Sequence, residues 1–238
     1  MSSKKGKVYM IPVRLGDDIK LEVLPISIKK IIEQTTHYIV EHEKNARRFI
    51  KKISPSKSQA SLELKLLNKF TDETEVSSYL DPCLDGNDVG VLSDAGCPGI
   101  ADPGADIARL AHQKNIEVIP LVGPSSILLA LMASGLNGQG FAFNGYLPID
   151  KQERKQRIKQ LERISFEQNQ SQIFIETPYR NDKLLKDLTE TLHPSTMVCV
   201  AVDITLTTEM IKTYTVTEWK YRKVDLHKRP CIFIIHKL

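Results

Sequence analysis

The regular alternation of short apolar runs with charged or amphipathic stretches is the feature that most constrains how this chain folds. The apolar runs have the length of strands, and the stretches between them have the length of helices. This order is typical of α/β proteins. We therefore predict an α/β fold with added strand content toward the C-terminus. Strands are expected at residues 7–12, 38–40, 89–92, 117–122, 141–146, 172–175, 197–202, 213–219 and 231–235, helices at 25–34, 44–52, 105–114, 125–134, 151–163 and 181–192, and a weakly helical stretch within 54–70.

The turn Val122-Gly123-Pro124 is the predicted boundary between two domains. A chain of 238 residues is long enough for one large domain or two small ones. We predict an N-terminal α/β lobe over residues 1–122 and a C-terminal α/β lobe with a mixed sheet over residues 123–238. No charged residue occurs from Val118 to Ile149, and the apolar run inside this stretch is far shorter than the ~20 residues of a membrane-spanning helix. We expect the stretch to be buried deeply, at a junction of domains or subunits.

Composition excludes several classes of protein without naming a partner. The 33 lysines and arginines against 29 aspartates and glutamates give a net charge of +4, which permits a polyanionic partner but is too small to demonstrate one. The four cysteines form no C-x-x-C pair and the six histidines are scattered, so we expect neither a disulfide scaffold nor a metal site. The N-terminus lacks an apolar segment of signal-peptide length. These features predict a cytoplasmic protein that does not enter a membrane.

Three loops rich in glycine or proline follow predicted strands, where parallel sheets bind their ligands. The sequence has neither G-x-G-x-x-G nor G-x-x-x-x-G-K-[ST], which argues against ordinary dinucleotide and ATP sites. In the densest loop, Gly96 and Gly99 let a ligand approach the backbone, and Asp94 and Asp102 can accept hydrogen bonds from it or stabilise a cation. Gly-Pro turns and an Asp helix cap explain the same residues equally well. The three loops lie at residues 93–104, 121–126 and 175–180.

Four blocks of sequence follow one another along the chain, namely Ser93-Asp94-Ala95-Gly96-x-Pro98-x-Ile100-x-Asp102-Pro103-Gly104, Pro120-Leu121-x-Gly123-Pro124-Ser125, Gly145-Tyr146-Leu147-Pro148 and Glu176-Thr177-Pro178-Tyr179-Arg180. Together they resemble the tetrapyrrole methylase superfamily of S-adenosylmethionine-dependent methyltransferases. Within it they are most similar to the branch of the bacterial ribosomal RNA small-subunit methyltransferase I, which 2′-O-methylates a cytidine of small-subunit rRNA. Because all four blocks occur in order, the resemblance is specific.

Elsewhere the chain departs from the pattern of that branch. The loop after the first strand keeps Gly16 but has lost the usual Asn, and of an Ala-Glu-Asp-Thr-Arg block only Glu41 is clearly kept. An Arg-Glu-Leu-Thr-Lys block is Val202-Asp203-Ile204-Thr205-Leu206 here, and a Gly-Glu pair is Arg229-Pro230. The cofactor half of the resemblance is therefore stronger than the substrate half.

The resemblance implies two lobes with S-adenosylmethionine in the cleft between them, and usually a homodimer. It implies that the protein mainly aligns an acceptor oxygen with the methyl carbon and sulfur of the donor, and that a ribose hydroxyl must lose its proton during the reaction. Asp94, Glu176 and Asp203 are the candidates for accepting that proton or positioning the hydroxyl, and Arg180 for holding a phosphate. For each of these, a helix cap or a surface ion pair is an equal alternative. The cofactor residues implied are Leu15, Ala95, Gly96, Ile100, Ser125, Ser126, Thr177, Pro178, Val202 and Pro230.

Ribosomal RNA is the partner that the resemblance favours, and basic residues offer a partial test of it. An aromatic content of only 6% leaves little surface for stacking unpaired bases. Two alternatives stay open: a methyltransferase that acts on a tetrapyrrole or another small molecule, and a dimeric module that binds the donor without turnover. The residues proposed to line a phosphate track are Arg47, Arg48, Lys51, Lys52, Lys151, Arg154, Lys155, Arg157, Lys159 and Arg163.

Overall fold

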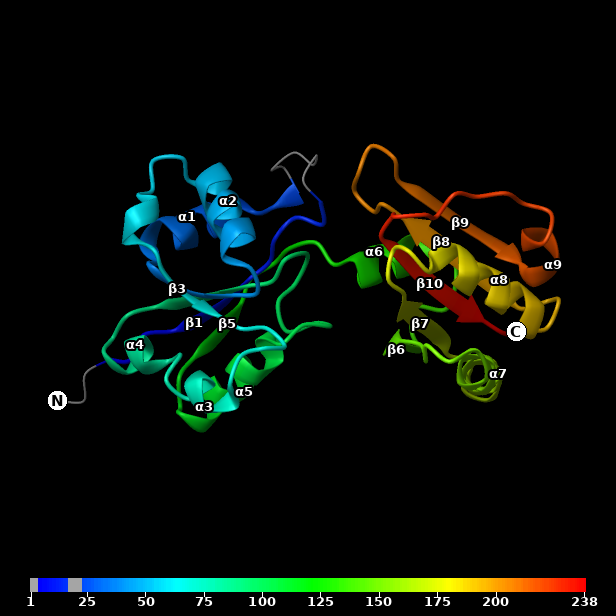
Figure 1. Cartoon of the computed structure of the whole chain (residues 1–238), viewed down its shortest axis with the longest axis horizontal. Helices are drawn as coiled ribbons and strands as arrows, with labels where there is room; N and C mark the ends of the chain where they lie inside the picture. Colours follow the sequence, from blue (N-terminus) through cyan, green and yellow to red (C-terminus); the bar gives the residue numbers. More distant parts are fainter. Residues whose placement is uncertain (1–3, 17–22) are drawn as a thin grey trace. The chain divides into compact units, whose positions relative to one another are not determined.

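The computed structural model describes residues 4–16 and 23–238 and has a mixed α/β fold with two sheets, as the sequence predicts. The chain divides into two compact units, Met1–Ser125 and Ser126–Leu238, each built around its own sheet (Figure 1). The boundary after residue 122 stays a prediction. Asp17 and Asp18 of the first loop lie outside the described residues.

The first unit, called unit 1 below, contains a parallel sheet of five strands in the order β3-β2-β4-β1-β5. The central strands are nearly continuous apolar runs because helices cover both of their faces. Tyr38 and Val40 pack with α1 and α2 on one face, whereas Ile39 and Val91 pack with α4 and α5 on the other. The elements are β1 (Val8–Ile11), α1 (Ile26–Gln34), β2 (His37–Val40), α2 (Glu43–Ile53), β3 (Glu63–Leu66), α3 (Glu73–Val76), α4 (Asp81–Leu84), β4 (Val89–Leu92), α5 (Gly104–Gln113) and β5 (Val118–Pro120), with a 3₁₀ turn at Gln59–Ser61.

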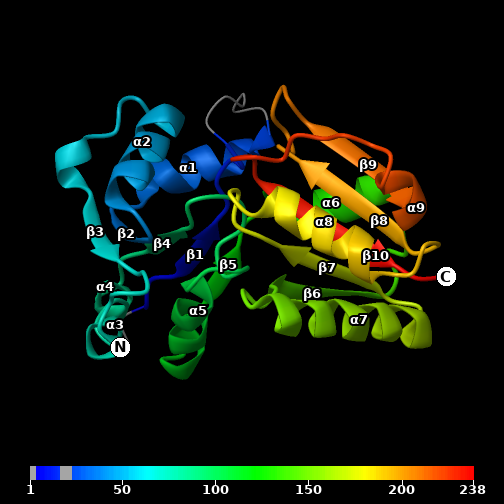
Figure 2. The same ribbon diagram turned by 45° about the vertical axis from the view of Figure 1, so that its right-hand side comes forward.

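The second unit, unit 2, has a mixed sheet in the order β6-β7-β10-β8-β9 (Figure 2). β6 and β7 are parallel, and the other neighbours are antiparallel. One core cluster joins Phe174 and Phe233 of the sheet, whose rings stack 6.1 Å apart, to Ile158 and Leu188 of two helices. The elements are α6 (Ser126–Ser134), β6 (Phe141–Tyr146), α7 (Lys151–Gln168), β7 (Ser171–Ile175), α8 (Asn181–Thr191), β8 (Met197–Val202), β9 (Met210–Thr215), α9 (Val216–Trp219) and β10 (Cys231–His236).

Two expectations about secondary structure are wrong in part. Within the stretch expected to be weakly helical, Glu63-Leu64-Lys65-Leu66 forms the edge strand β3, because alternating charged and apolar residues suit a strand with one solvated face. The strand expected at residues 213–219 ends at Thr215, where a capping box starts α9. In that box the Thr215 hydroxyl accepts from the Glu218 N–H while the Glu218 carboxylate accepts from the Thr215 N–H.

The uncharged stretch 118–149 is only partly buried within the single chain, and its place at a junction of domains or subunits stays a prediction. In α6, Ala130 and Leu131 are buried, but Leu128 is 50% exposed and Met132 is 80% exposed. The helix is apolar on almost every side, and only one side can pack against β8, β9 and β10. Freedom from charge therefore did not by itself bury this helix within the single chain.

Candidate functional site

The carboxyl ends of β2 and β4 bring two dipeptides of unit 1 together. Because Val40 pairs with Leu92 in parallel register, Glu41-His42 follows β2 directly beside Ser93-Asp94 after β4. Nδ1 of His42 lies 2.6 Å from Oδ2 of Asp94. The Asp94 N–H in turn donates to Oε1 of Glu41, at 2.9 Å. Register alone thus builds a histidine–carboxylate pair at the carboxyl ends of these two strands.

This pair has the geometry of an oriented proton acceptor. A carboxylate that holds Nδ1–H of an imidazole fixes the tautomer whose Nε2 is free to accept a proton, and it stabilises the imidazolium that results. The side chain of His42 is 65% exposed, so an incoming ligand can reach the ring. Histidine 42 was not among the sequence candidates. Its signal was present, since it follows a buried strand at a position where the branch pattern has another residue.

The loop after β4 is held by the carboxylate of Asp102. Its Oδ1 accepts from the N–H groups of Gly99 and Gly104, both at 2.7 Å. Gly99 has φ +83°, and a Cβ on Gly104 would lie 2.8 Å from the Gly99 nitrogen and 2.9 Å from Asp102 Oδ1. These glycines are therefore required by the turn itself. The loop also returns to the end of β1, where the Val13 N–H donates to Gly96 C=O at 2.9 Å.

The carboxylates of Glu41, Asp94 and Asp102 lie at this edge, and hydrogen-bond donors balance their negative charge only in part. Oδ2 of Asp102 is buried and has no hydrogen-bond partner among the described residues. Burial raises the pKa of Asp102 above its usual value, against the effect of the two glycine N–H groups. Burial also raises the pKa of Glu41, with added repulsion from Asp94 and Asp102. Such a site suits a cation or a donor of hydrogen bonds.

Leu15, Ala95, Gly96 and Ile100, which the sequence assigned to cofactor binding, all belong to the loops around this edge. A Cβ on Gly96 would lie 3.2 Å from Leu15 Cδ2, so the two loops touch there. Ile100 is exposed in the same loop. The structure also brings the turn before Ser125 to this loop, because Sγ of Cys97 lies 3.4 Å from the carbonyl oxygen of Pro124. Ser126 is the first residue of α6.

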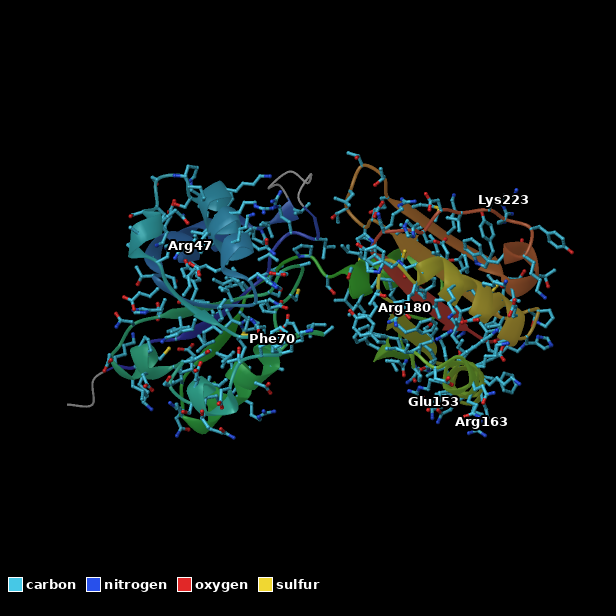
Figure 3. The ribbon with its side chains drawn as sticks, in the orientation of Figure 1. Arg47, Phe70, Glu153, Arg163, Arg180 and Lys223 are labelled. Atoms are coloured by element: carbon cyan, nitrogen blue, oxygen red, sulfur yellow. The ribbon has the colours of Figure 1, made fainter. Side chains whose placement is uncertain are left out.

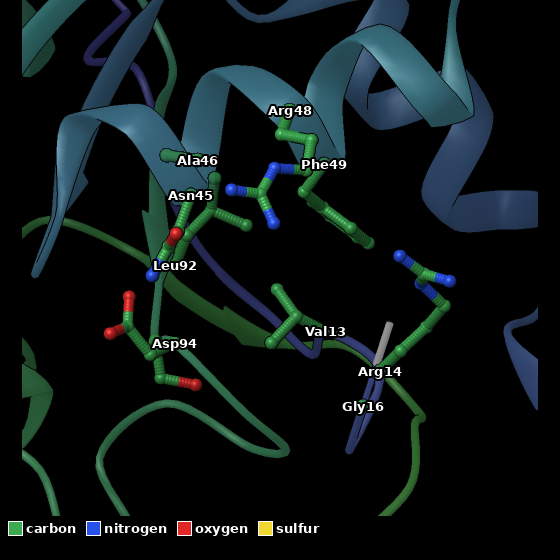
Figure 4. A pocket seen from close by; sticks show the side chains of 10 residues that line it. Val13, Arg14, Gly16, Asn45, Ala46, Arg48, Phe49, Leu92 and Asp94 are labelled. Atoms are coloured by element: carbon green, nitrogen blue, oxygen red, sulfur yellow. The ribbon is translucent and has the colours of Figure 1, made fainter. Parts of the chain in front are cut away.

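A cavity of about 150 Å³ opens beside Asp94, between the end of β1 and the first turns of α2. Arg14, Asn45 and Arg48 are among the residues that line it (Figure 4). Arg14 is buried and was not a sequence candidate, although an arginine directly after an apolar strand is unusual enough to mark it. The cavity thus combines hydrogen-bond donors with the Asp94 carboxylate.

In unit 2 the predicted residues after β7 form a closed ion pair. Oε1 of Glu176 accepts from Arg180 Nε at 3.0 Å, from Arg180 Nη2 at 2.6 Å and from the Thr177 N–H at 2.6 Å. The Glu176 side chain is only 3% exposed. Pro178 C=O accepts from the Lys228 N–H at 3.0 Å. These polar groups of the loop therefore already have partners, either within the loop or in the segment before β10.

Asp203 is held in the same way at the neighbouring strand ends. Cys231 pairs with Val202 in antiparallel register, which places Pro230 beside Asp203, and the Asp203 N–H donates to Pro230 C=O at 3.0 Å. Oδ2 of Asp203 accepts from Arg229 Nε at 2.7 Å and from the Thr208 hydroxyl at 2.8 Å. Its φ of 50° lies in the left-handed region. Thus Glu176, Thr177, Pro178, Arg180, Val202, Asp203 and Pro230 gather at one edge of the unit 2 sheet.

One residue of the suggested phosphate track is part of the core instead. Arg154 is buried, with Nε donating to Asp187 Oδ2 at 2.8 Å and Nη1 donating to the carbonyl oxygens of Pro148 and Ile149. Glu153 and Arg163 lie on the outer side of α7 (Figure 3). The charge pattern of α7 could not reveal the partner on α8.

Cysteine and metal chemistry find little support. All four cysteines are free thiols. Burial raises the pKa of the Cys83 and Cys199 thiols to about 11 and that of Cys231 to about 12, which disfavours the reactive thiolate. Among residues 4–16 and 23–238, no group of three metal-ligating side chains is found. No helix within those residues is long and apolar enough to cross a membrane.

The protein is a two-unit α/β protein. It has one unit with a parallel sheet and one with a mixed sheet, and polar loops gather at the strand ends of each. Comparison with known proteins identifies its family. The chain belongs to the family of tetrapyrrole (corrin/porphyrin) methylases, whose model matches residues 20–219.

Individual relatives agree with this assignment. Over 173 residues the chain is 30% identical to a ribosomal RNA small subunit methyltransferase I from Vibrio cholerae, covering 71% of this chain and 59% of that protein. A protein of the same name from Neisseria meningitidis serogroup A is 37% identical over 134 residues, covering 56% of this chain and 44% of that protein. The chain thus spans about half the length of these relatives. The crystal structure of the methyltransferase CobJ matches with a TM-score of 0.64 at 14% identity, covering 98% of this chain and 94% of that one, which supports the fold.

Proposed function

We propose that this protein is an S-adenosylmethionine-dependent methyltransferase that 2′-O-methylates a cytidine of ribosomal RNA. The family and the names of the relatives support the class of reaction. The single observation that carries the proposal is the His42–Asp94 pair at the edge of the unit 1 sheet. Methylation of a hydroxyl requires a proton acceptor, and this is the one oriented acceptor that the geometry of the candidate edges offers within the described residues.

The residues of the unit 1 edge fit the donor chemically. S-adenosylmethionine carries a sulfonium, an ammonium and ribose hydroxyls, and the buried, unpaired Oδ2 of Asp102 together with Glu41 offers acceptors for such groups. The residues proposed to hold it are Leu15, Ala95, Gly96, Ile100, Ser125, Ser126, Thr177, Pro178, Val202 and Pro230. Because the Thr177 N–H is bound to Glu176 and the Pro178 C=O to the Lys228 N–H, these two would contact the donor through side-chain atoms.

When bound, the donor supplies an electrophilic methyl group. In the proposed mechanism His42 accepts the proton of the ribose hydroxyl at Nε2, and Asp94 stabilises the charged ring through Nδ1. Glu41 fixes the backbone of Asp94 and thereby the position of the pair. Glu176 and Asp203 are assigned the role of positioning their loops, since an arginine already holds each carboxylate.

The acceptor and the assembly belong to the same proposal. Exposed lysines and arginines on α2 and α7 supply contacts for RNA phosphates. A homodimer is proposed because α6 leaves Leu128 and Met132 exposed, and a cytoplasmic location follows from an rRNA substrate. Light scattering on the purified protein measures the assembly directly, and a monomer at all concentrations would remove the dimer from the proposal.

Methyl transfer tests the function. The purified protein is incubated with donor labelled at the methyl group and, in parallel, with small ribosomal subunits or with porphyrinoids. We expect label in rRNA, located on a ribose oxygen by mass mapping, and binding of S-adenosylhomocysteine in calorimetry. Label only in the porphyrinoid would favour the small-molecule alternative. Binding without any methylated product would favour a module without turnover, and no binding would reject the proposal.

A further inference from the structure

A pocket on unit 2 combines aromatic rings with cations and is separate from the clusters described above. It has a volume of about 360 Å³ and lies between β9 and the segment that follows α9. β9 is the last strand of its sheet, and no other strand of the described residues pairs with this side. The side chains that give the pocket its chemistry are Lys212, Tyr214, Trp219, Tyr221, Arg222 and Lys223.

The aromatic part of the pocket is preorganised. The Trp219 indole N–H donates to the Val198 carbonyl oxygen at 2.8 Å, which anchors the ring in the core. Tyr214 meets that ring edge to face at 5.2 Å, and the Arg222 guanidinium lies 3.7 Å above the Tyr214 ring. A planar group therefore already stacks on Tyr214 at the pocket surface. Tyr221, by contrast, is 86% exposed.

The charges of the pocket select the kind of ligand. Lys212, Arg222 and Lys223 are exposed cations, and the lining contains no acidic residue. Glu218, the nearby acid on α9, already accepts from the backbone and hydroxyl of Thr215. Lys223 lies near the β9 edge (Figure 3). An exposed tyrosine beside a stacked guanidinium and two lysines fits a ligand that has flat faces and negative charge.

We propose that this pocket binds an unpaired nucleotide of the substrate RNA. The base stacks on Tyr221 and on the Arg222–Tyr214 pair, and Lys212 and Lys223 contact the flanking phosphates. An acidic peptide would satisfy the lysines but not the aromatic faces, so RNA is favoured. The inference rests on the proposed function, because it takes RNA as the substrate. The low aromatic content of the whole chain did not predict this site, because Tyr214, Trp219 and Tyr221 are concentrated in one short segment.

Binding of a fluorescein-labelled, single-stranded oligoribonucleotide to the full chain tests the pocket by anisotropy. Three variants are compared: Tyr221→Ala, Arg222→Gln and the matched control Phe70→Ala. Phe70 is also an exposed aromatic residue with a neighbouring cation, since Lys69 Nζ lies 4.8 Å from its ring centre, but it belongs to unit 1. We expect Tyr221→Ala to weaken binding about tenfold, Arg222→Gln by a smaller factor and Phe70→Ala not at all.

An abasic strand with the same phosphates separates stacking from charge. It should bind the unaltered protein about tenfold more weakly than the normal strand, and Tyr221→Ala should have no further effect on it. Three outcomes would overturn the inference: RNA binding that is unchanged in Tyr221→Ala, a loss of binding in Phe70→Ala as large as that in Tyr221→Ala, or an affinity for a polyglutamate peptide equal to that for the oligoribonucleotide. Methyl transfer to small ribosomal subunits and calorimetry with S-adenosylhomocysteine separate the two proposals. If rRNA methylation and donor-product binding persist while Tyr221→Ala leaves RNA binding unchanged, this pocket alone is removed. If the unaltered protein neither binds the donor product nor methylates rRNA, the proposed function is removed as well.

Discussion

At the strand ends of unit 1, His42 lies beside three carboxylates, those of Glu41, Asp94 and Asp102, none of which is paired with an arginine or a lysine in the contacts described above. At the strand ends of unit 2, by contrast, an arginine pairs with each carboxylate. Nδ1 of His42 contacts Asp94 Oδ2, and the rest of the ring is largely exposed. Glu176 and Asp203 instead accept from Arg180 and Arg229, and both are almost fully buried. An acid that must first break charged hydrogen bonds is poorly suited to accept a substrate proton.

We interpret this difference as a division of roles between the strand ends of unit 1 and those of unit 2. The acids Glu41, Glu176 and Asp203 look equivalent in sequence, because each directly follows an apolar strand. Their partners decide their roles. We assign proton transfer to unit 1 and loop positioning to the ion pairs of unit 2, and the four predictions below test that assignment.

The largest expected effect is on activity, in His42→Gln. Loss of the proton acceptor should lower the rate of methyl transfer by about 10²- to 10³-fold while leaving S-adenosylhomocysteine binding unchanged. The matched control is His37→Gln, because His37 begins the same strand and also pairs with a carboxylate, Glu63, at 3.2 Å. Equal rates in the two variants, measured in single turnovers, would move the proton acceptor elsewhere.

Removing Arg180 should instead affect stability. Arg180→Ala leaves the buried Glu176 carboxylate without its cation, and we expect a loss of about 2–3 kcal/mol in the free energy of unfolding, reduced from the fully buried case because Arg180 is partly solvated. Urea unfolding of the variant measures this. The double variant with Glu176→Gln should recover part of the loss. If it recovers nothing, the ion pair is not what holds the loop.

Two substitutions of Asp203 distinguish what its ion pair contributes to stability from what its left-handed backbone conformation costs. Asp203→Asn weakens the contact to Arg229 yet tolerates φ 50°, so we expect a loss of about 1 kcal/mol. Asp203→Ala adds the cost of a left-handed non-glycine residue, for a total of about 2 kcal/mol. Identical unfolding midpoints for the two variants would show that φ at this position carries no strain.

The smallest expected effect is that of Asp102→Asn, which should raise the free energy of unfolding where the other substitutions lower stability or activity. Because burial raises the pKa of this carboxyl in the fold above its ordinary 3.8, the wild-type protein loses stability as the pH rises through the raised value. Asp102→Asn keeps an oxygen for Gly99 and Gly104 and removes that loss. Its unfolding free energy should exceed the wild-type value by less than about 1 kcal/mol at pH 7, and the excess should shrink as the pH falls below the ordinary value. An excess that grows in acid would contradict the sign.

Two departures from the family pattern, at Asp203 and at Arg229-Pro230, prove to be one feature. They are separated along the chain, but β8 and β10 are neighbours in the sheet, and the two side chains form an ion pair there. The residues that depart from the pattern in these two places are therefore partners in one ion pair. Only strand pairing reveals this.

The sequence by itself determined the order of strands and helices, the α/β class and the loops that matter, because apolar periodicity and Gly-Pro turns act between residues close along the chain. The tertiary structure alone decided which polar side chains meet. His42 and Asp94 are 52 positions apart, and Arg154 pairs with a residue 33 positions away. The exposed face of α6 was decided in the same way. Register and helix packing set such contacts, and neither is encoded in the local pattern of either partner.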